Sequence, residues 1–199
     1  MDDIITVIFN LFMLPFEKLA LHKRRKDIIS KVKGNVLEVG SGGGLNFNYY
    51  DKENVQSLTV MDLKFNKFIK NHELNNKINI NYLLGNIEII PFEDNTFDSV
   101  VGTLIFCSVE NQEKALKEIH RVLKPGGKLY FLEHVMPEAK HYIKIANACN
   151  SSWKKIGKCN INRETHKRIR EANFKIEEFE MFGKECFIFV KGIGIKPNN

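Results

Sequence analysis

The sequence contains few cysteines and no apolar stretch long enough to cross a bilayer. Its four cysteines include no C-x-x-C pair, which argues against a zinc site and a disulfide framework and fits a reducing compartment. The apolar run at 4–14 has 11 residues, whereas a membrane-spanning helix needs about 20. We also expect no secretory signal, because acidic Asp2 and Asp3 stand where basic residues belong. We therefore expect a cytoplasmic protein without a metal site.

The sequence also lacks internal repeats, low-complexity tracts and linkers, which predicts a single domain over residues 1–199. A hydrophobic share of 43% is enough for an ordinary buried core. The net charge is +3 over residues 1–33, −3 over 34–137 and +6 over 138–199. Because the basic residues are not interleaved with aromatic residues in a nucleic-acid-binding pattern, we expect no nucleic-acid partner.

From residue 34 onward, short apolar runs alternate with amphipathic stretches. This rhythm predicts βαβ units, and hence an α/β fold with a parallel sheet covered on both faces by helices. The last two apolar runs lie close enough in sequence to form an antiparallel pair. The expected strands are 36–39, 57–62, 80–85, part of 97–106, 128–135, 175–182 and 185–192; the expected helices are 4–14, one containing the basic cluster 22–26, a short one near 65–69, 111–123 and 163–172.

A glycine-rich turn follows the first expected strand, in the pattern E-x-G-x-G-x-G at Glu38, Gly40, Gly42 and Gly44. Glycines at a strand end let the backbone turn tightly and approach a ligand without an intervening Cβ. In an open α/β sheet, ligands bind at the carboxyl ends of the strands, where the strand order reverses. A dinucleotide fingerprint would require glycine at position 45, where the chain has Leu45. The spacing therefore disfavours a nicotinamide-dependent oxidoreductase, which shares this kind of sheet.

This turn is the first of four motifs that together resemble class I S-adenosylmethionine-dependent methyltransferases. Asp62 ends the second expected strand, 18 residues after Gly44. The run GNIEIIPFEDNTFD (85–98) is similar to the family's GDAE-x-x-PF-x-D-x-x-FD segment, and HRVLKPGGKLYFLEH (120–134) is similar to its R-x-LKPGG turn. The resemblance implies a Rossmann-like fold with a mostly parallel seven-stranded sheet, an antiparallel last strand and helices on both faces.

The resemblance also implies that residues 34–135 bind S-adenosyl-L-methionine, which leaves as S-adenosyl-L-homocysteine. The methionine part would lie against the glycine turn, and the Asp62 carboxylate would accept hydrogen bonds from the ribose hydroxyls. Asn86 stands where the family has Asp, which keeps an acceptor for the adenine amine but removes its charge. The residues implied to contact the cofactor are Gly40, Ser41, Gly42, Gly44, Asp62, Leu63, Asn86 and Ile87, with Thr103 and Leu104 bordering the methyl group unless they only pack at the strand end.

The methyl acceptor is expected to be a small molecule. His134, at the end of the fifth expected strand, is the candidate general base, with a structural, hydrogen-bonded role as its alternative. Glu133 either orients His134 or bonds to backbone. Cys107 either lines the pocket or, as we favour, is a small buried apolar residue. Trp153 lies in the segment 136–199, which is expected to cover the acceptor and end in a hairpin, and serves there as a lid or as core.

Two subfamilies compete for the identity of the acceptor. The match through residue 165 resembles methyltransferase-like proteins that methylate alkyl thiols at membranes, whereas ubiquinone/menaquinone-type C-methyltransferases share mainly the core motifs. A catalytically silent cofactor-binding module is a further alternative. Residues 1–33 are expected to form a helical cap over the pocket, or residues 4–26 contact an anionic membrane surface through His22–Lys26. No oligomeric state is predicted.

Overall fold

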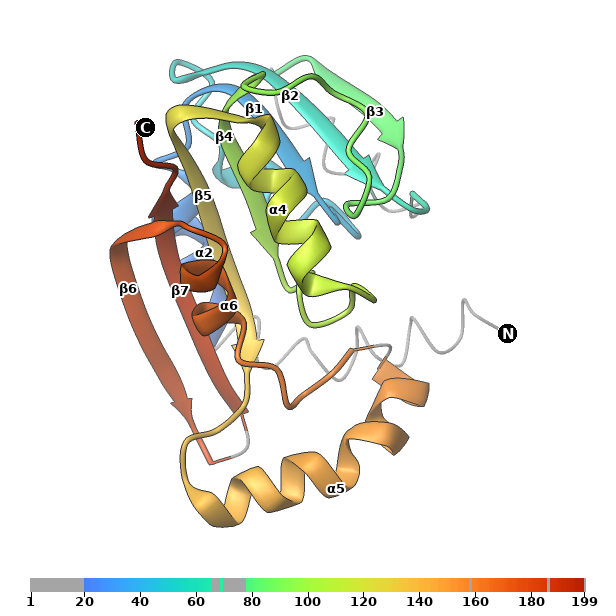
Figure 1. Cartoon of the computed structure of the whole chain (residues 1–199). Helices are drawn as coiled ribbons and strands as arrows, with labels where there is room; N and C mark the ends of the chain where they lie inside the picture. The colour runs from blue at the N-terminus through green and yellow to red at the C-terminus, as the bar shows by residue number, and fades with distance from the viewer. Residues whose placement is uncertain (1–19, 66–68, 70–77, 158, 186, 199) are drawn as a thin grey trace.

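The computed structural model describes residues 20–65, 69, 78–157, 159–185 and 187–198 (Figure 1). The helix expected over 4–14 lies outside these residues, as does most of the one expected near 65–69. The described elements are α2 (His22–Ile29), β1 (Gly34–Val39), the short 3-10 helix η2 (Phe47–Tyr49), β2 (Val55–Asp62), β3 (Ile80–Leu84), β4 (Phe97–Thr103), α4 (Gln112–Val122), β5 (Leu123–Val135), α5 (Lys140–Gly157), α6 (Thr165–Glu171), β6 (Lys175–Lys184) and β7 (Phe187–Ile195).

The seven strands form one sheet in the order β3-β2-β1-β4-β5-β7-β6. The pairs from β3 to β5 are parallel, whereas β7 runs antiparallel to both β5 and β6. This confirms the predicted fold class, including the antiparallel hairpin at the end of the chain. The strand order reverses between β1 and β4, so the carboxyl ends of these two strands flank the crevice where ligands bind in such sheets.

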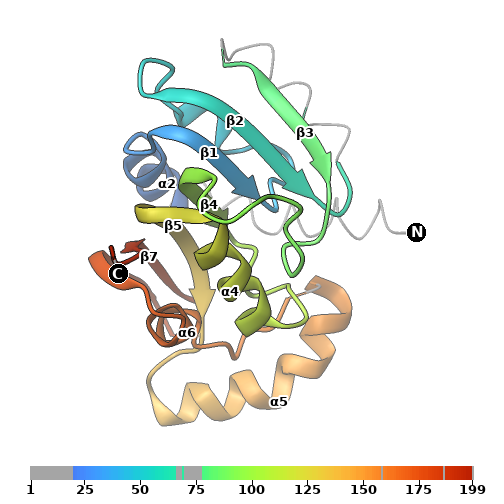
Figure 2. The same cartoon turned by 45° about the horizontal axis from the view of Figure 1, so that its top comes forward.

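Helices cover the two faces of the sheet (Figures 1 and 2). On one face, α4 begins at an Asn111 cap whose Oδ1 accepts a hydrogen bond from the Lys114 N–H at 2.9 Å. Its apolar side packs with β4 and β5, as the helical spacing predicted. On the other face, α2 packs Ile28 and Ile29 against a second apolar cluster. The buried side chains of α4 are Ala115, Leu116, Ile119 and Val122.

Several strand boundaries differ from the expected ones by one to three residues, and the start of β5 differs by five; the end of β4 and the start of β5 each have a local cause. The β4 strand ends at Thr103, because Leu104 adopts a left-handed conformation with φ of 55°. The β5 strand begins at Leu123, five residues before the expected start, because Leu123 pairs with Phe97 of β4 ahead of the Pro-Gly-Gly turn. The end of β4 shapes the candidate site, since the left-handed Leu104 turns the chain sharply there.

The long helix α5 lies apart from the sheet and from the helices on its two faces, beyond the carboxyl end of β5 (Figures 1 and 2). Of its side chains that are described, only that of Ala146 is buried. The chain then returns through residues 159–164 to α6, which packs beside α4. Among the described residues, no helix combines the length and apolarity needed to cross a membrane.

Candidate active site

The glycine-rich turn leaves β1 with three glycines in the left-handed region, at φ values of 69°, 55° and 80° for Gly40, Gly42 and Gly44. A Cβ on Gly40 would lie 2.4 Å from Ile105 Cδ1, so this glycine lets the turn after β4 pack against the turn after β1. A Cβ on Gly42 or Gly43 would meet no described atom within 4 Å. The outer glycines thus serve packing, while the middle of the turn borders open space.

Asp62, the last residue of β2, lies beside this open space. Its Oδ2 accepts a hydrogen bond from the Gly42 N–H at 3.1 Å, and its Oδ1 accepts a longer one, 3.3 Å, from the Lys64 N–H. The next residue, Leu63, is 73% exposed. The parallel pairing of β1 with β2 therefore places a fixed carboxylate and an apolar side chain at the rim of the glycine turn. A carboxylate in this position has acceptor capacity left for a ligand's hydroxyl groups.

Ser41 supplies a second indication of a ligand. Its side chain is buried, and its Oγ has no hydrogen-bond partner among the described residues. Buried hydroxyl groups are normally hydrogen-bonded, so an unpaired one beside open space fits a polar ligand group. An amino acid moiety, with its ammonium and carboxylate, supplies such a group. The turn and its neighbours therefore fit the amino acid and ribose portions of S-adenosylmethionine.

Asn86 and Ile87 follow β3, next to the same rim. The Asn86 Oδ1 accepts a hydrogen bond from the Glu88 N–H at 2.9 Å, which closes a local turn that an aspartate would form in the same way. The Glu88 Oε1 accepts a bond from the Asn111 N–H at 2.8 Å and joins this turn to the start of α4. Ile87 is buried and Asn86 is exposed. The departure from the family's aspartate changes the charge and keeps the turn.

A buried polar network that the sequence analysis missed lies beneath the glycine turn. Glu38 of β1 accepts hydrogen bonds from the Tyr50 hydroxyl at 2.6 Å and the Asn46 amide at 3.0 Å. The Arg25 Nη1 donates to Asn46 Oδ1 at 2.7 Å and to Thr103 Oγ1 at 3.0 Å. Burial raises the pKa of Glu38 to about 7, although these hydrogen bonds act in the opposite direction. The network connects α2, the glycine turn and the end of β4.

The missed member with most consequence is Arg25, which is only 2% exposed. It belongs to the basic cluster 22–26, whose exposed members include Lys23 and Lys26. Arg24 of the same cluster bonds to Glu180 of β6 at 2.8 Å. A helical count was the signal available: position 25 lies three and four residues before Ile28 and Ile29, on the buried face of the helix.

Glu133 holds the turn that follows Thr103. Its Oε1 accepts hydrogen bonds from the N–H groups of Ile105 and Phe106 at 2.8 and 3.0 Å. The side chain is fully buried, and burial raises its pKa to about 8. Of the two roles expected for Glu133, the structure shows the bond to backbone. Together with the Leu132 carbonyl, which accepts the Leu104 N–H at 2.8 Å, it fixes the left-handed Leu104 in place.

His134 packs on the opposite face of the sheet from Glu133. It pairs across the sheet with Phe189 of β7, and the two rings meet edge to face with their centroids 5.3 Å apart. Successive residues of a strand point to opposite faces, so His134 and Glu133 project on opposite sides of β5. The ring contact supports the structural alternative, while the general-base role stays a prediction.

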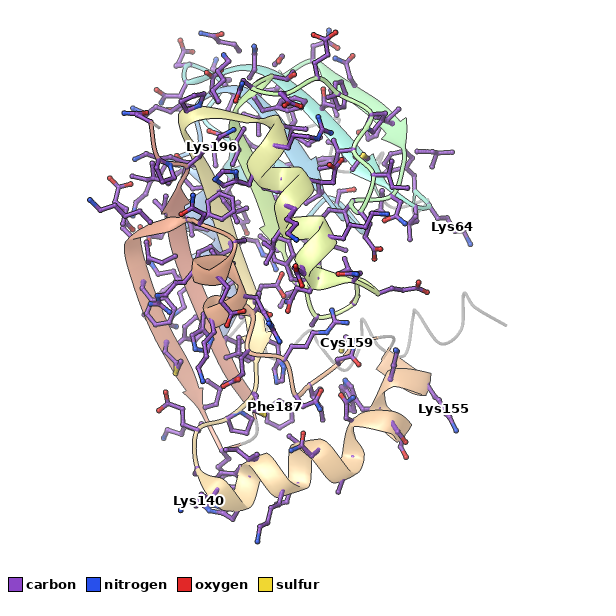
Figure 3. All side chains as sticks on the ribbon, in the orientation of Figure 1. Lys64, Lys140, Lys155, Cys159, Phe187 and Lys196 are labelled. Atoms are coloured by element: carbon purple, nitrogen blue, oxygen red, sulfur yellow. The ribbon has the colours of Figure 1, made fainter. Side chains whose placement is uncertain are left out.

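Cys107, Trp153 and Arg163 come together at the end of this turn, although they are far apart in sequence. The Trp153 Nε1–H donates to the Cys159 Sγ at 3.1 Å, and Asn160 bonds to the Cys107 carbonyl. Arg163, which the sequence analysis did not assign a role, donates to the carbonyl oxygens of Phe106 and Val109. Figure 3 shows Cys159 on the chain between α5 and α6. The segment expected to cover the acceptor is thus anchored to the turn after β4.

Comparisons with known proteins agree with this geometry. A family model described as "Methyltransferase domain" matches residues 37–131. Thiol S-methyltransferase TMT1A from Homo sapiens is 32% identical over 182 residues, covering 85% of this chain and 71% of that protein. Ubiquinone/menaquinone biosynthesis C-methyltransferase UbiE from Pasteurella multocida (strain Pm70) is 38% identical over 96 residues, which are 47% of this chain and 36% of that protein.

Solved structures show the same fold. An S-adenosylmethionine-dependent methyltransferase from Mesorhizobium loti aligns with a TM-score of 0.67 at 16% identity, covering 87% of this chain and 96% of that chain. The matched family model begins in β1 and ends in β5, and so includes the glycine turn, Asp62 and the turn after β4. With the match to the human protein along most of its length, the chain belongs to the family of S-adenosylmethionine-dependent methyltransferases that contains the thiol S-methyltransferases.

Proposed function

We propose that the protein transfers the methyl group of S-adenosyl-L-methionine to the sulfur of a small thiol. The observation that best supports the use of this cofactor is the contact between Gly42 and Asp62 beside the open middle of the glycine turn. The relatives that match most of the chain are named thiol S-methyltransferases, whereas the quinone-pathway relative matches less than half of it. The thiol proposal therefore rests on sequence similarity to the human protein beyond β5 as well as within the cofactor-binding core.

We assign the cofactor to the rim formed by the ends of β1, β2 and β3. Gly40, Ser41, Gly42 and Gly44 would face its amino acid part, with the Ser41 Oγ as a hydrogen-bond partner. Asp62 and Leu63 would hold the ribose, and Asn86 and Ile87 the adenine. The bound cofactor supplies a sulfonium methyl group that is already activated for displacement. The residues of this protein bind it, orient it toward the end of β4 and exclude water.

Thr103 and Leu104 are proposed to border the methyl group. Thr103 is held by Arg25 and Asn46, and Leu104 is fixed by its neighbours in β5. A thiol acceptor suits this arrangement, because a cysteine-like thiol with a pKa near 8.5 is a few per cent thiolate at neutral pH. Its proton passes to solvent, with the predicted general base His134 as the alternative acceptor. Methylation at carbon would instead require a base for the proton released from that carbon.

An acceptor assay tests this function directly. The protein is incubated with S-adenosylmethionine carrying a labelled methyl group and with an alkyl thiol, a quinol or an amine, and labelled products are separated. We expect transfer to the thiol, and a much lower rate in an Asp62→Ala variant. Label on the quinol carbon alone would favour the quinone-type alternative. Binding of S-adenosylhomocysteine without transfer to any acceptor would favour a catalytically silent module.

We further propose a cytoplasmic location with contact to anionic membrane surfaces through residues 4–26. Of this segment, residues 4–19 lie outside the described structure, whereas Lys23 and Lys26 are exposed. A flotation assay with anionic vesicles tests the contact. We expect the double variant Lys23→Glu, Lys26→Glu to lose vesicle binding, and Lys154→Glu, Lys155→Glu on α5 to retain it. Equal binding by both variants would contradict the proposal.

A further inference from the structure

Two buried cysteines meet between the turn after β4 and the segment that joins α5 to α6. Cys107 and Cys159 are 4% and 8% exposed. The adjoining backbone is tied together, since the Asn160 N–H and its Nδ2 donate to the Cys107 carbonyl at 2.8 and 3.1 Å. The two side chains also interact, since each shifts the pKa of the other, and the Cys107 Sγ lies 3.7 Å from the Leu104 carbonyl oxygen. Neither cysteine has a part in the proposed methyl transfer.

The surroundings of the two sulfur atoms differ in charge. The Cys159 sulfur accepts a hydrogen bond from the Trp153 Nε1–H at 3.1 Å, and the Arg163 guanidinium lies near it. The interaction with Cys107, and then these contacts, lower the pKa of Cys159. The same interaction, with burial, raises the pKa of Cys107. The Trp153 N–H at the Cys159 sulfur stabilises its thiolate, and Cys107 is the more buried of the two, so Cys159 is suited to act as the attacking thiolate and Cys107 as the thiol that reacts second.

We propose that Cys107 and Cys159 form a thiol–disulfide exchange site whose oxidant is a small-molecule disulfide. The Cys159 thiolate attacks one sulfur of the disulfide R–S–S–R, which gives a mixed disulfide and releases one R–S⁻. Cys107 then loses its proton and attacks the Cys159 sulfur, which gives the Cys107–Cys159 disulfide and releases a second R–S⁻. The two cysteines are oxidised, the small disulfide is reduced, and solvent takes the proton.

The cross-link would covalently join the two parts of what we call the acceptor side, namely the turn after β4 (residues 104–109) and residues 159–164. Cys107 lies in the turn that follows Thr103 and Leu104, and Cys159 follows α5, within the segment expected to cover the acceptor. A disulfide here fixes the covering segment to the turn, which hydrogen bonds from Asn160 and Arg163 otherwise hold. The inference does not depend on which acceptor is methylated, because the oxidant reacts at the cysteines and not at the cofactor rim.

The test is thiol trapping on the folded protein. The protein is incubated with glutathione disulfide, free thiols are alkylated with N-ethylmaleimide, and the digested peptides are identified by mass spectrometry. We expect a linked peptide pair containing Cys107 and Cys159, reversed by dithiothreitol. The exposed Cys149 on α5 provides the matched control, and Cys149→Ser should form the same cross-link in the same yield.

Two single variants separate the steps. In Cys107→Ser, the mixed disulfide between glutathione and Cys159 should accumulate, because no second thiol resolves it. In Cys159→Ser, no cross-link should form and Cys107 should stay free. The cross-linked wild-type protein should unfold at a higher temperature than its reduced form, which shows that the link formed in the folded state. Modification at Cys149 alone, or no adduct at Cys159 in Cys107→Ser, would overturn the proposal.

Discussion

The two ends of the candidate site are built in opposite ways. At the cofactor rim, the ends of β1 and β2 expose backbone and one carboxylate. Apart from Arg25 of α2, the contacts that shape the rim come from nearby residues in the sequence or from adjacent strands. At the acceptor side, Glu133, Asn160 and Arg163 are partly or fully buried, and they bond to a turn more than twenty residues away. Binding the cofactor thus depends on an open backbone, and shaping the acceptor side depends on tertiary contacts.

Loss of Arg163 should produce the largest effect and would break the acceptor side. An Arg163→Ala variant leaves the carbonyl oxygens of Phe106 and Val109 without their charged donor. We expect its free energy of unfolding to fall by about 3 kcal/mol in denaturant titrations. The control is Arg168→Ala, since Arg168 is an exposed residue paired with Glu171. Its loss should lower the free energy of unfolding by less than about 0.5 kcal/mol. Equal losses in both variants would show that Arg163 does not anchor the turn.

Two glycine variants should separate packing from ligand binding within the cofactor rim. Gly40→Ala combines a left-handed backbone with a clash against Ile105, and should cost about 2 kcal/mol of unfolding free energy. The Cβ added in Gly43→Ala meets no described atom within 4 Å, so the stability of this variant should equal that of the wild type. Its affinity for S-adenosylhomocysteine should fall, because the Cβ enters the space proposed for the ligand. Calorimetric titration measures that affinity. Wild-type affinity in Gly43→Ala would place the ligand elsewhere.

Asp62→Ala should weaken binding at the rim and leave the acceptor side intact. Removing a carboxylate that accepts ligand hydroxyl groups costs about 1–3 kcal/mol of binding free energy. The change is measured as the dissociation constant of S-adenosylhomocysteine, with thermal unfolding as the check on stability. Glu53→Ala removes another exposed carboxylate and should bind as the wild type does. An unaltered dissociation constant for Asp62→Ala would remove this residue from the proposed ribose site.

Per pH unit, the smallest predicted effect is a pH dependence that comes from Glu133. Its folded-state pKa of about 8 lies above its ordinary value of 4.5, so folding favours the protonated form. Its contribution to stability is therefore complete at low pH and is lost as pH rises toward about 8. Relative to Glu133→Gln, the wild type should lose about 1 kcal/mol of unfolding free energy per pH unit between about pH 5 and pH 8. A constant difference across this range would contradict the assignment.

The cofactor rim was predictable from sequence because its information is local. The positions of the glycines and of Asp62 follow from where two strands end, and a parallel sheet brings those ends together. The succession of strands along the chain, and which of them are parallel or antiparallel, was predicted for the same reason. The structure places the glycine turn and Asp62 side by side, although contact with a cofactor stays a proposal.

The acceptor side was not predictable in the same way. The partners of Glu133 and Cys107 were left open, because hydrogen bonds between β5, the turn after β4 and residues 159–163 join parts of the chain with no common periodicity. Arg25 was missed for a related reason: a cationic cluster next to an apolar helix is usually solvated, and only the sheet's packing shows which member points inward. Burial of a charge is a property of tertiary structure, and composition does not reveal it.

The buried Arg25 also bears on how the protein can be divided. The matched family model begins at residue 37, yet the cation that supports Asn46 and Thr103 comes from a helix before that point. We therefore expect a fragment cut at the family boundary to lose the support of its own glycine turn. A minimal cofactor-binding fragment, for screening inhibitors or grafting onto another protein, should begin ahead of α2.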